Sequence, residues 1–160
     1  MESLHSYWRM EYVKAPKEDE GFQDLFSKLH QTDNDKEALI LWRSSFNYLV
    51  LNKFPYNPGH LLAIPYRSVA NLEDLSEEES NDLMATITKG KQIVDKTFQP
   101  DGFNIGFNFG SAAGAGITAH LHCHIVPRWE GDTNFMPVIG KTRVLPQALT
   151  ETWEILKKHC

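Results

Sequence analysis

Residues 120–126 read His120-Leu121-His122-Cys123-His124-Ile125-Val126, and they are the most distinctive part of the sequence. Imidazoles alternate with apolar or small side chains, and a period of two is typical of a β-strand. In a strand the three histidines share one face, and the residues between them share the other face and pack on the core. A row of solvated histidines is the plain alternative. Three imidazoles on one face rarely serve packing alone, so we predict that this face carries the function.

More strands are predicted before this one from runs of branched and aromatic side chains. Pro55, Pro58 and Gly59 predict a turn over residues 52–59, so a hairpin is expected over residues 46–64, ending at Pro65. Residues 111–116 are small and predict a flexible loop before the histidines. The predicted strands cover residues 38–42, 46–51, 60–64, 103–109 and 120–126.

Two longer helices and one short helix complete the prediction. Ser76 to Glu79 fits a capping box, so a helix is expected from there to about Phe98. A last helix is expected from about Pro146, and a short one near residues 22–30. Neighbouring strands with helices between the groups favour an α+β domain: an antiparallel sheet with one long and one C-terminal helix. The predicted buried stripes are Leu83, Ile87, Val94 and Phe98 on the long helix, and Leu149, Trp153 and Leu156 on the last.

Composition restricts the classes of function. The 160 residues are 41% hydrophobic and 23% charged, which suits one globular domain spanning residues 1–160 and excludes a disordered chain. A net charge of -5 argues against nucleic acid as a partner, since nucleic-acid binding needs a basic face. No apolar run is long enough to cross a bilayer, and the first residues do not resemble a secretory signal, so no membrane partner is expected. Two cysteines without a Cys-x-x-Cys pair argue against a disulfide scaffold or a zinc ribbon and fit the cytoplasm.

The histidine row has two functional interpretations. The three imidazoles could coordinate one metal ion, or one of them could be a nucleophile that its neighbours orient. Residues 110–116 read Gly-Ser-Ala-Ala-Gly-Ala-Gly, and small residues let backbone amides approach a phosphate closely, although they also suit a plain tight turn. A phosphate-binding loop beside the histidines favours the nucleophile, and we predict no metal ligands.

These residues resemble the histidine triad family, whose motif alternates three histidines with hydrophobic residues. Residues 8–13, 51–60, 101–106 and 127–138 are similar to one branch of that family. The branch contains bacterial histidine triad hydrolases and diadenosine tetraphosphate phosphorylases, and it is related to the fragile histidine triad proteins. The resemblance implies a histidine triad domain with segments 1–37 and 129–160 as family-typical extensions. It also implies a homodimer built on a shared sheet.

The implied activity is hydrolysis or transfer at the α-phosphate of an adenosine polyphosphate such as diadenosine tetraphosphate. His122 would attack the phosphorus and carry a nucleotidyl-histidine intermediate, which water or, in a phosphorylase, inorganic phosphate then attacks. A nucleophilic imidazole needs one bare nitrogen and one donating nitrogen, and the backbone carbonyl of His120 is expected to accept that bond. His124 would stabilise the phosphate oxygens, and His120 would orient the row.

Other family positions transfer one by one. Asn52 matches a ribose-binding position, although it could be an ordinary turn asparagine. Val50 and Leu62 would line an apolar slot for the base, or simply belong to the core. His60 would support the triad. Asn108 matches a phosphate-binding amide, and its alternative is a cap at the end of a strand.

The segments on either side of the triad depart from the better-known branches. Gly114, Ala115 and Gly116 begin the stretch of residues 114–119 that stands where other branches place a hydroxyl before the triad, so backbone amides or Thr118 would assist the leaving group. Trp129 opens a segment typical of phosphorylase-like relatives and is expected to shape the site for the distal part of the substrate. His5, His30 and His159 match nothing in the family and are expected at the surface.

The partner expected from the resemblance is a small-molecule nucleotide substrate. We predict no resident cofactor and leave open a magnesium ion that arrives with the substrate's phosphates. Structural zinc is not expected, because residues 20–26, where many relatives carry a cysteine pair, contain no cysteine. Two other functions stay open: a nucleotide-binding sensor with little turnover, and a metal-dependent hydrolase that uses the histidines as ligands.

Overall fold

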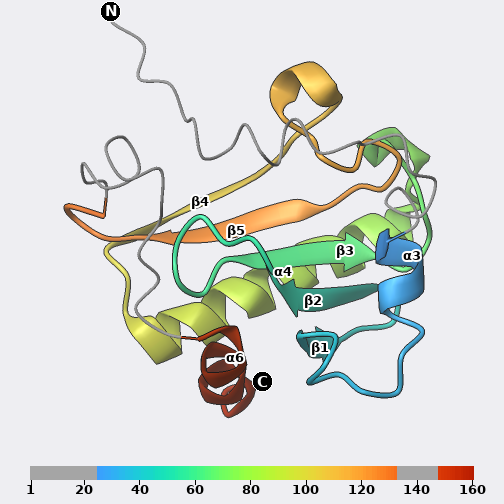
Figure 1. The fold of residues 1–160 in the computed structure, drawn as a ribbon. Helices are drawn as coiled ribbons and strands as arrows, with labels where there is room; N and C mark the ends of the chain where they lie inside the picture. Colours follow the sequence, from blue (N-terminus) through green and yellow to red (C-terminus); the bar gives the residue numbers. More distant parts are fainter. Residues whose placement is uncertain (1–24, 133–147) are drawn as a thin grey trace, which may run out of the picture.

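The computed structural model describes residues 25–132 and 148–160, which build one five-stranded antiparallel sheet. The strand order across the sheet is β1-β2-β3-β5-β4, so β4 lies at one edge and β5 sits between β3 and β4 (Figure 1). The strands are β1 (Ile40–Arg43), β2 (Asn47–Leu51), β3 (Leu61–Pro65), β4 (Gly102–Phe107) and β5 (Cys123–Arg128).

Helices lie against the sheet at different places. The long helix α4 (Glu77–Phe98) packs against β2, β3 and β5, and α6 (Leu149–Lys157) packs against α4 and β1 (Figure 1). Trp153 of α6 donates its indole N–H to the carbonyl of Ile40, 3.0 Å away, which ties the helix to β1. The short elements are α3 (Leu25–Leu29) and two 3-10 turns, η1 (Leu72–Asp74) and η2 (Ser111–Ala113). The predicted α+β class, with one long and one C-terminal helix on an antiparallel sheet, is confirmed.

The two faces of the sheet have separate apolar clusters. On the helical face, α4 and α6 cover a core that includes Leu49, Leu61 and Ile125. On the opposite face, Phe26 of α3 joins a smaller cluster with side chains of β1, β2 and β3. Successive side chains of each strand point to opposite faces of the sheet, so neighbouring residues belong to different clusters.

The beginning of α4 follows the prediction. The hydroxyl of Ser76 accepts from the backbone N–H of Glu79 at 3.2 Å, and the Glu79 carboxylate accepts from the Ser76 N–H at 2.7 Å. Arg67 adds a bidentate ion pair to that carboxylate, at 2.9 and 2.6 Å. The helix ends where Gln99 takes a left-handed conformation, with φ of 47°. Of the predicted stripe, Leu83, Ile87 and Val94 are buried and Phe98 is half-buried.

The strand that carries the histidines is displaced from its predicted limits. It begins at Cys123 rather than His120, and it continues through Pro127 to Arg128. Both neighbours explain the later start, because Ala63 of β3 and Phe107 of β4 each end their pairing opposite Cys123. Alternation persists before the strand, since Leu121 is buried in the helical-face core like Cys123 and Ile125.

The remaining differences from the prediction are small. The first strand begins at Ile40 instead of residue 38, and Pro65 is the last residue of β3. The strand at residues 103–109 ends earlier, at Phe107. The last helix begins at Leu149, and the short helix near residues 22–30 appears from Leu25, where the described chain starts. Within the described residues, none of the helices has the length and apolar character that crossing a membrane requires.

Candidate active site

The histidines lie on the sheet face opposite α4. Register places His124 of β5 between Leu62 of β3 and Gly106 of β4, and Leu62 pairs in turn with Val50 of β2. Side chains in one such row point to the same face. Val50 and Leu62, predicted to line a base slot, therefore share a face with His124, where both are buried in the apolar cluster that includes Phe26.

His122 has the geometry of a nucleophile with a fixed tautomer. Its Nδ1 lies 2.8 Å from the backbone carbonyl of His120, and a carbonyl can only accept, so Nδ1 carries the proton. The neutral ring therefore leaves Nε2 bare. Burial lowers the pKa of His122, and the bond to the carbonyl opposes that shift only in part. The hydrogen bond expected from the sequence is present.

His120 is held from two sides and supports this arrangement. Its Nε2–H donates to the Pro65 carbonyl at 2.8 Å, and the Ser27 hydroxyl lies 3.3 Å from Nδ1. Burial lowers the pKa of His120, and the bond to Pro65 offsets this shift only in part. The ring of Phe26 meets both His120 and His122 edge-on, with centroids 5.7 and 5.1 Å apart. Helix α3 thus covers the first two histidines.

His124 forms a pair with His60 that fixes a second tautomer. The backbone N–H of Tyr56 donates to Nδ1 of His60 at 3.0 Å, so that nitrogen is bare and the ring proton is on Nε2. His60 Nε2–H then donates to Nδ1 of His124 at 2.9 Å. Because His124 Nδ1 accepts, the proton of His124 is on Nε2. The site therefore combines a bare nitrogen on His122 with an N–H donor on His124, whose ring centroids are 5.1 Å apart.

Comparisons of the sequence and the fold with known proteins give the family of this chain. The model of the HIT domain matches residues 33–131, which is more than half of the chain. The chain belongs to the HIT family. This HIT chain is 40% identical over 162 aligned positions to an AP-4-A phosphorylase of Mycobacterium tuberculosis, with 98% of this chain and 83% of the relative covered.

More distant matches agree on the family and the fold. A bis(5'-nucleosyl)-tetraphosphatase (asymmetrical) of Schizosaccharomyces pombe is 37% identical over 93 residues, covering 58% of the HIT chain and 50% of the relative. The crystal structure of a histidine triad nucleotide-binding protein from Sulfolobus tokodaii superposes with a TM-score of 0.67 at 22% identity, covering 84% of the HIT chain and 90% of that structure. The predicted family and fold are confirmed.

Asn52 of the HIT chain lies beside the His60–His124 pair. Its side-chain oxygen accepts from the Phe54 N–H at 2.9 Å, as a turn asparagine does, and its Nδ2 lies 3.4 Å from Nδ1 of His60. Asn108 is half-buried just after β4. Continuing the register one step from Phe107 and Cys123 places Asn108 level with His122.

The loop before the triad uses part of its hydrogen-bonding capacity internally. Gly114, in the left-handed region with φ of 88°, donates its N–H to the Ser111 carbonyl, and Ala115 donates to the Gly110 carbonyl. Ala115 and Gly116 are buried, whereas Thr118 is exposed. Two of the three amides predicted to cradle phosphate therefore close the turn in this structure.

Trp129 lies apart from the triad along the chain. It directly follows the far end of β5 and is half-buried, and its backbone N–H donates to Asp132 at 3.2 Å. The segment after it, from residue 133 to 147, lies outside the described residues.

Sequence reasoning missed several residues that surround the histidines in the HIT chain. Phe26, Ser27 and Tyr56 contact the rings from segments predicted only as a helix and a turn, and nothing in their local sequence indicates these contacts. His30, predicted to lie at the surface, is half-buried. Its ring packs against Tyr48 and Tyr66, with centroids 5.7 and 5.0 Å away, because α3 folds back over β2 and β3. His159 is exposed as predicted, and His5 lies outside the described residues.

Metal coordination was the competing interpretation of the triad. Within residues 25–132 and 148–160, no three side chains of His, Cys, Asp or Glu converge on a point where they could hold a metal ion. Cys123 belongs to the helical-face core, where burial raises the pKa of its thiol to about 12. The histidine nitrogens instead bond to carbonyls and to each other, which suits nucleophilic chemistry.

Proposed function

We propose that this HIT protein hydrolyses or transfers the nucleotidyl group of adenosine polyphosphates such as diadenosine tetraphosphate. The observation that carries the proposal is the bare Nε2 of His122, fixed by the 2.8 Å bond from Nδ1–H to the His120 carbonyl. The relatives named AP-4-A phosphorylase and bis(5'-nucleosyl)-tetraphosphatase support the substrate class.

The reaction has two displacements. Nε2 of His122 forms a bond to the α-phosphorus while the bond from phosphorus to the bridging oxygen breaks, and the released polyphosphate takes the electron pair. A second nucleophile then attacks the nucleotidyl-histidine, and the P–N bond breaks to regenerate the imidazole. Nε2–H of His124 would donate to the phosphate oxygens, where negative charge builds up.

The remaining predicted residues have supporting roles in the proposal. Val50 and Leu62 form the apolar floor beneath the base, and Asn52 binds the ribose hydroxyls. Asn108 and the loop of Gly114, Ala115 and Gly116 bind phosphate. The face that Val50 and Leu62 share with His124 and the register of Asn108 with His122 support their roles. Asn52 is supported by its place beside the His60–His124 pair, and the loop by its place just before the triad, where the Gly114 and Ala115 amides must first leave the bonds that close the turn.

The second nucleophile distinguishes two candidate activities. Water gives a hydrolase, whereas inorganic phosphate gives a diadenosine tetraphosphate phosphorylase. The 40% identity to an AP-4-A phosphorylase over nearly the whole chain favours the second candidate. Products formed from diadenosine tetraphosphate with and without phosphate decide between them: ADP and ATP in the presence of phosphate indicate phosphorolysis, and AMP indicates hydrolysis.

The decisive variant is His122→Ala. We expect it to abolish turnover and to keep most of the nucleotide affinity, because the ring supplies the nucleophile and few of the binding contacts. His159→Ala, which removes an exposed histidine, is the matched control and should retain full activity. Full turnover by His122→Ala would refute the proposal, and tight binding without turnover by the wild-type protein would support a sensor instead. A metal ion bound to the purified protein, together with activity that is lost on its removal and restored by the same metal, would support the metal-dependent hydrolase.

Trp129 is proposed to shape the site for the distal part of the substrate. Its support is its place in the turn after β5, in a segment that resembles phosphorylase-like relatives. Trp129→Ala should alter the preference between dinucleotides with short and long phosphate chains. Unchanged preference would remove this role.

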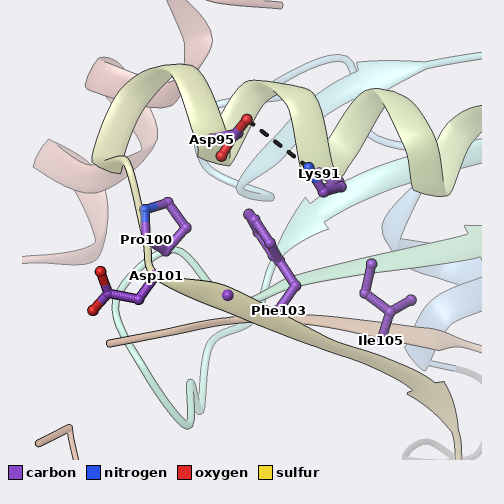
Figure 2. A pocket seen from close by; sticks show the side chains of 7 residues that line it. Lys91, Asp95, Pro100, Asp101, Phe103 and Ile105 are labelled. Carbon is purple, nitrogen blue, oxygen red and sulfur yellow. Dashed lines mark ion pairs between the residues drawn. The ribbon is translucent and has the colours of Figure 1, made fainter. Parts of the chain in front are cut away.

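A homodimer joined through β4 is also proposed. Within the described residues, β4 lies at one edge of the sheet and pairs with β5 alone, and an edge strand is suited to pairing with a second copy. A hollow beside it is separate from the histidine face, and Figure 2 shows Phe103 and Ile105 beneath the Lys91–Asp95 ion pair. The hollow is lined by Lys91, Asp95, Pro100, Asp101, Gly102, Phe103 and Ile105.

The domain organisation and location remain part of the proposal. We propose a single histidine triad domain with residues 1–37 and 129–160 as extensions, supported by a HIT match over residues 33–131. A cytoplasmic location is supported by two free thiols, Cys123 and Cys160, of which the second is exposed.

A further inference from the structure

The turn after β5 is organised around the carboxylate of Asp132. Arg128 donates to it twice, from Nε at 2.6 Å and from Nη2 at 2.8 Å, and the Trp129 N–H donates at 3.2 Å. A fourth donor comes from a distant part of the chain, since Nδ2 of Asn57 lies 2.8 Å from Oδ2 of Asp132. The Asp132 side chain is only 11% exposed, so these bonds are shielded from water.

Asn57 connects this turn to the loop between β2 and β3. Its amide uses both hydrogens, one on Asp132 and one on the Pro127 carbonyl at 2.8 Å. The backbone carbonyl of Asn57 accepts from the backbone N–H of His60 at 3.1 Å. The Asn57 side chain therefore ties the loop that carries Tyr56 and His60 to the end of β5.

Tyr56, next to Asn57, reaches both members of the histidine pair. Its N–H donates to His60, and its ring lies 4.7 Å from that of His60 and stacks on His124 at 5.7 Å and 16°. An imidazole whose Nδ1 accepts this N–H has its proton on Nε2, where it can donate to His124. Without the Tyr56 N–H, the Asn52 amide at 3.4 Å holds Nδ1 of His60 less firmly, and in the other tautomer of His60 two bare nitrogens would face each other.

We propose that Asp132 and Asn57 are positioning residues for the proposed reaction. They hold the Tyr56 amide on His60, and His60 in turn keeps the proton of His124 on Nε2, directed to the substrate phosphate. The inference deepens the proposed function and rests on it. It gives the turn around Asp132 a role in positioning His60. Local sequence alone does not reveal this role, because residues 57 and 132 are far apart in the chain.

The test compares Asp132→Ala and Asn57→Ala with Asn104→Ala. Asn104 accepts from Nη1 of Arg128 at 2.6 Å, so its removal disturbs the same arginine without touching Asn57. Long-range proton–nitrogen NMR of the purified protein reports which ring nitrogens of His60 and His124 are bare, independently of activity. We expect Asp132→Ala and Asn57→Ala to mix the tautomers of both rings and to lower kcat about 10- to 100-fold with little change in KM. Asn104→Ala should leave both readouts unchanged.

A charge swap tests whether the two residues act together and covers the case in which an alanine variant does not fold. Asn57→Asp alone places two carboxylates against each other and should lower kcat strongly. Adding Asp132→Asn restores a donor and an acceptor between positions 57 and 132, but position 57 still cannot donate to the Pro127 carbonyl. The double variant should therefore be more active than Asn57→Asp alone and less active than the wild type. Wild-type ring tautomers in Asp132→Ala, or a double variant no better than Asn57→Asp, would overturn the inference. If His122→Ala kept its turnover, the proposed function would fail while the tautomer result would still stand.

Discussion

At the scale of single residues, the buried histidines make stability depend on pH. Burial lowers the pKa of His120 and His122 below the ordinary value of 6.5, so the folded protein keeps these rings neutral where the unfolded chain binds protons. Below pH 6.5 the unfolded state therefore gains protons that the folded state does not, and the free energy of unfolding falls as the pH falls through the lowered pKa. The slope approaches about 1.4 kcal/mol per pH unit for each ring that stays neutral.

Urea unfolding between pH 8 and pH 5 measures this effect. Glu79 affects stability in a separate pH range, because its pair with Arg67 lowers its pKa from 4.5 to about 2. Its contribution to the free energy of unfolding is lost only as the pH falls below 4.5. Turnover should also fall as the pH falls, since protonation of His122 Nε2 removes the nucleophile. A free energy of unfolding that is constant or rises between pH 6.5 and pH 5 would contradict the prediction.

Sequence alone could identify the residues of the triad but only part of their bonding. The bond from His122 to the His120 carbonyl spans two residues, so it follows from local geometry. The bond between His60 and His124 spans 64 residues and exists because β3 and β5 are neighbours, which alternation in one strand does not reveal. The packing of the His30 ring against Tyr48 and Tyr66 depends in the same way on where α3 folds back.

At the scale of elements, the start of α4 should be sensitive to its cap. Ser76→Ala removes the acceptor for the Glu79 N–H and should lower the free energy of unfolding by about 1 kcal/mol. Ser80→Ala makes the same chemical change at an exposed position inside the helix, where alanine is favoured, and should be neutral or slightly stabilising. Thermal and urea unfolding of both variants provide the comparison, and equal stability of the two would refute the cap's contribution.

The same contrast explains which element boundaries could be predicted. The limits of α4 lie in its own sequence, in the Ser76 cap and the turn that follows Phe98. The limits of β5 are set by its partners, because Ala63 and Phe107 end their pairing at Cys123. Pro127, which comes directly after the predicted strand of residues 120–126, is tolerated inside β5 because the pairing of β3 stops at Ile125, so no N–H is needed from residue 127 on that side.

At the scale of the whole molecule, the proposed homodimer has the edge strand β4 at its interface. Ile105 is 43% exposed on β4 beside the hollow of Figure 2, and a charge there would be buried if two β4 strands met. Ile105→Asp should therefore shift the protein from dimer to monomer in sedimentation velocity at micromolar concentration. Leu72→Asp is the matched control, because Leu72 is equally exposed at 43% but lies in η1, before α4 begins. A monomeric wild-type protein, or dissociation of both variants alike, would show that β4 is not the interface.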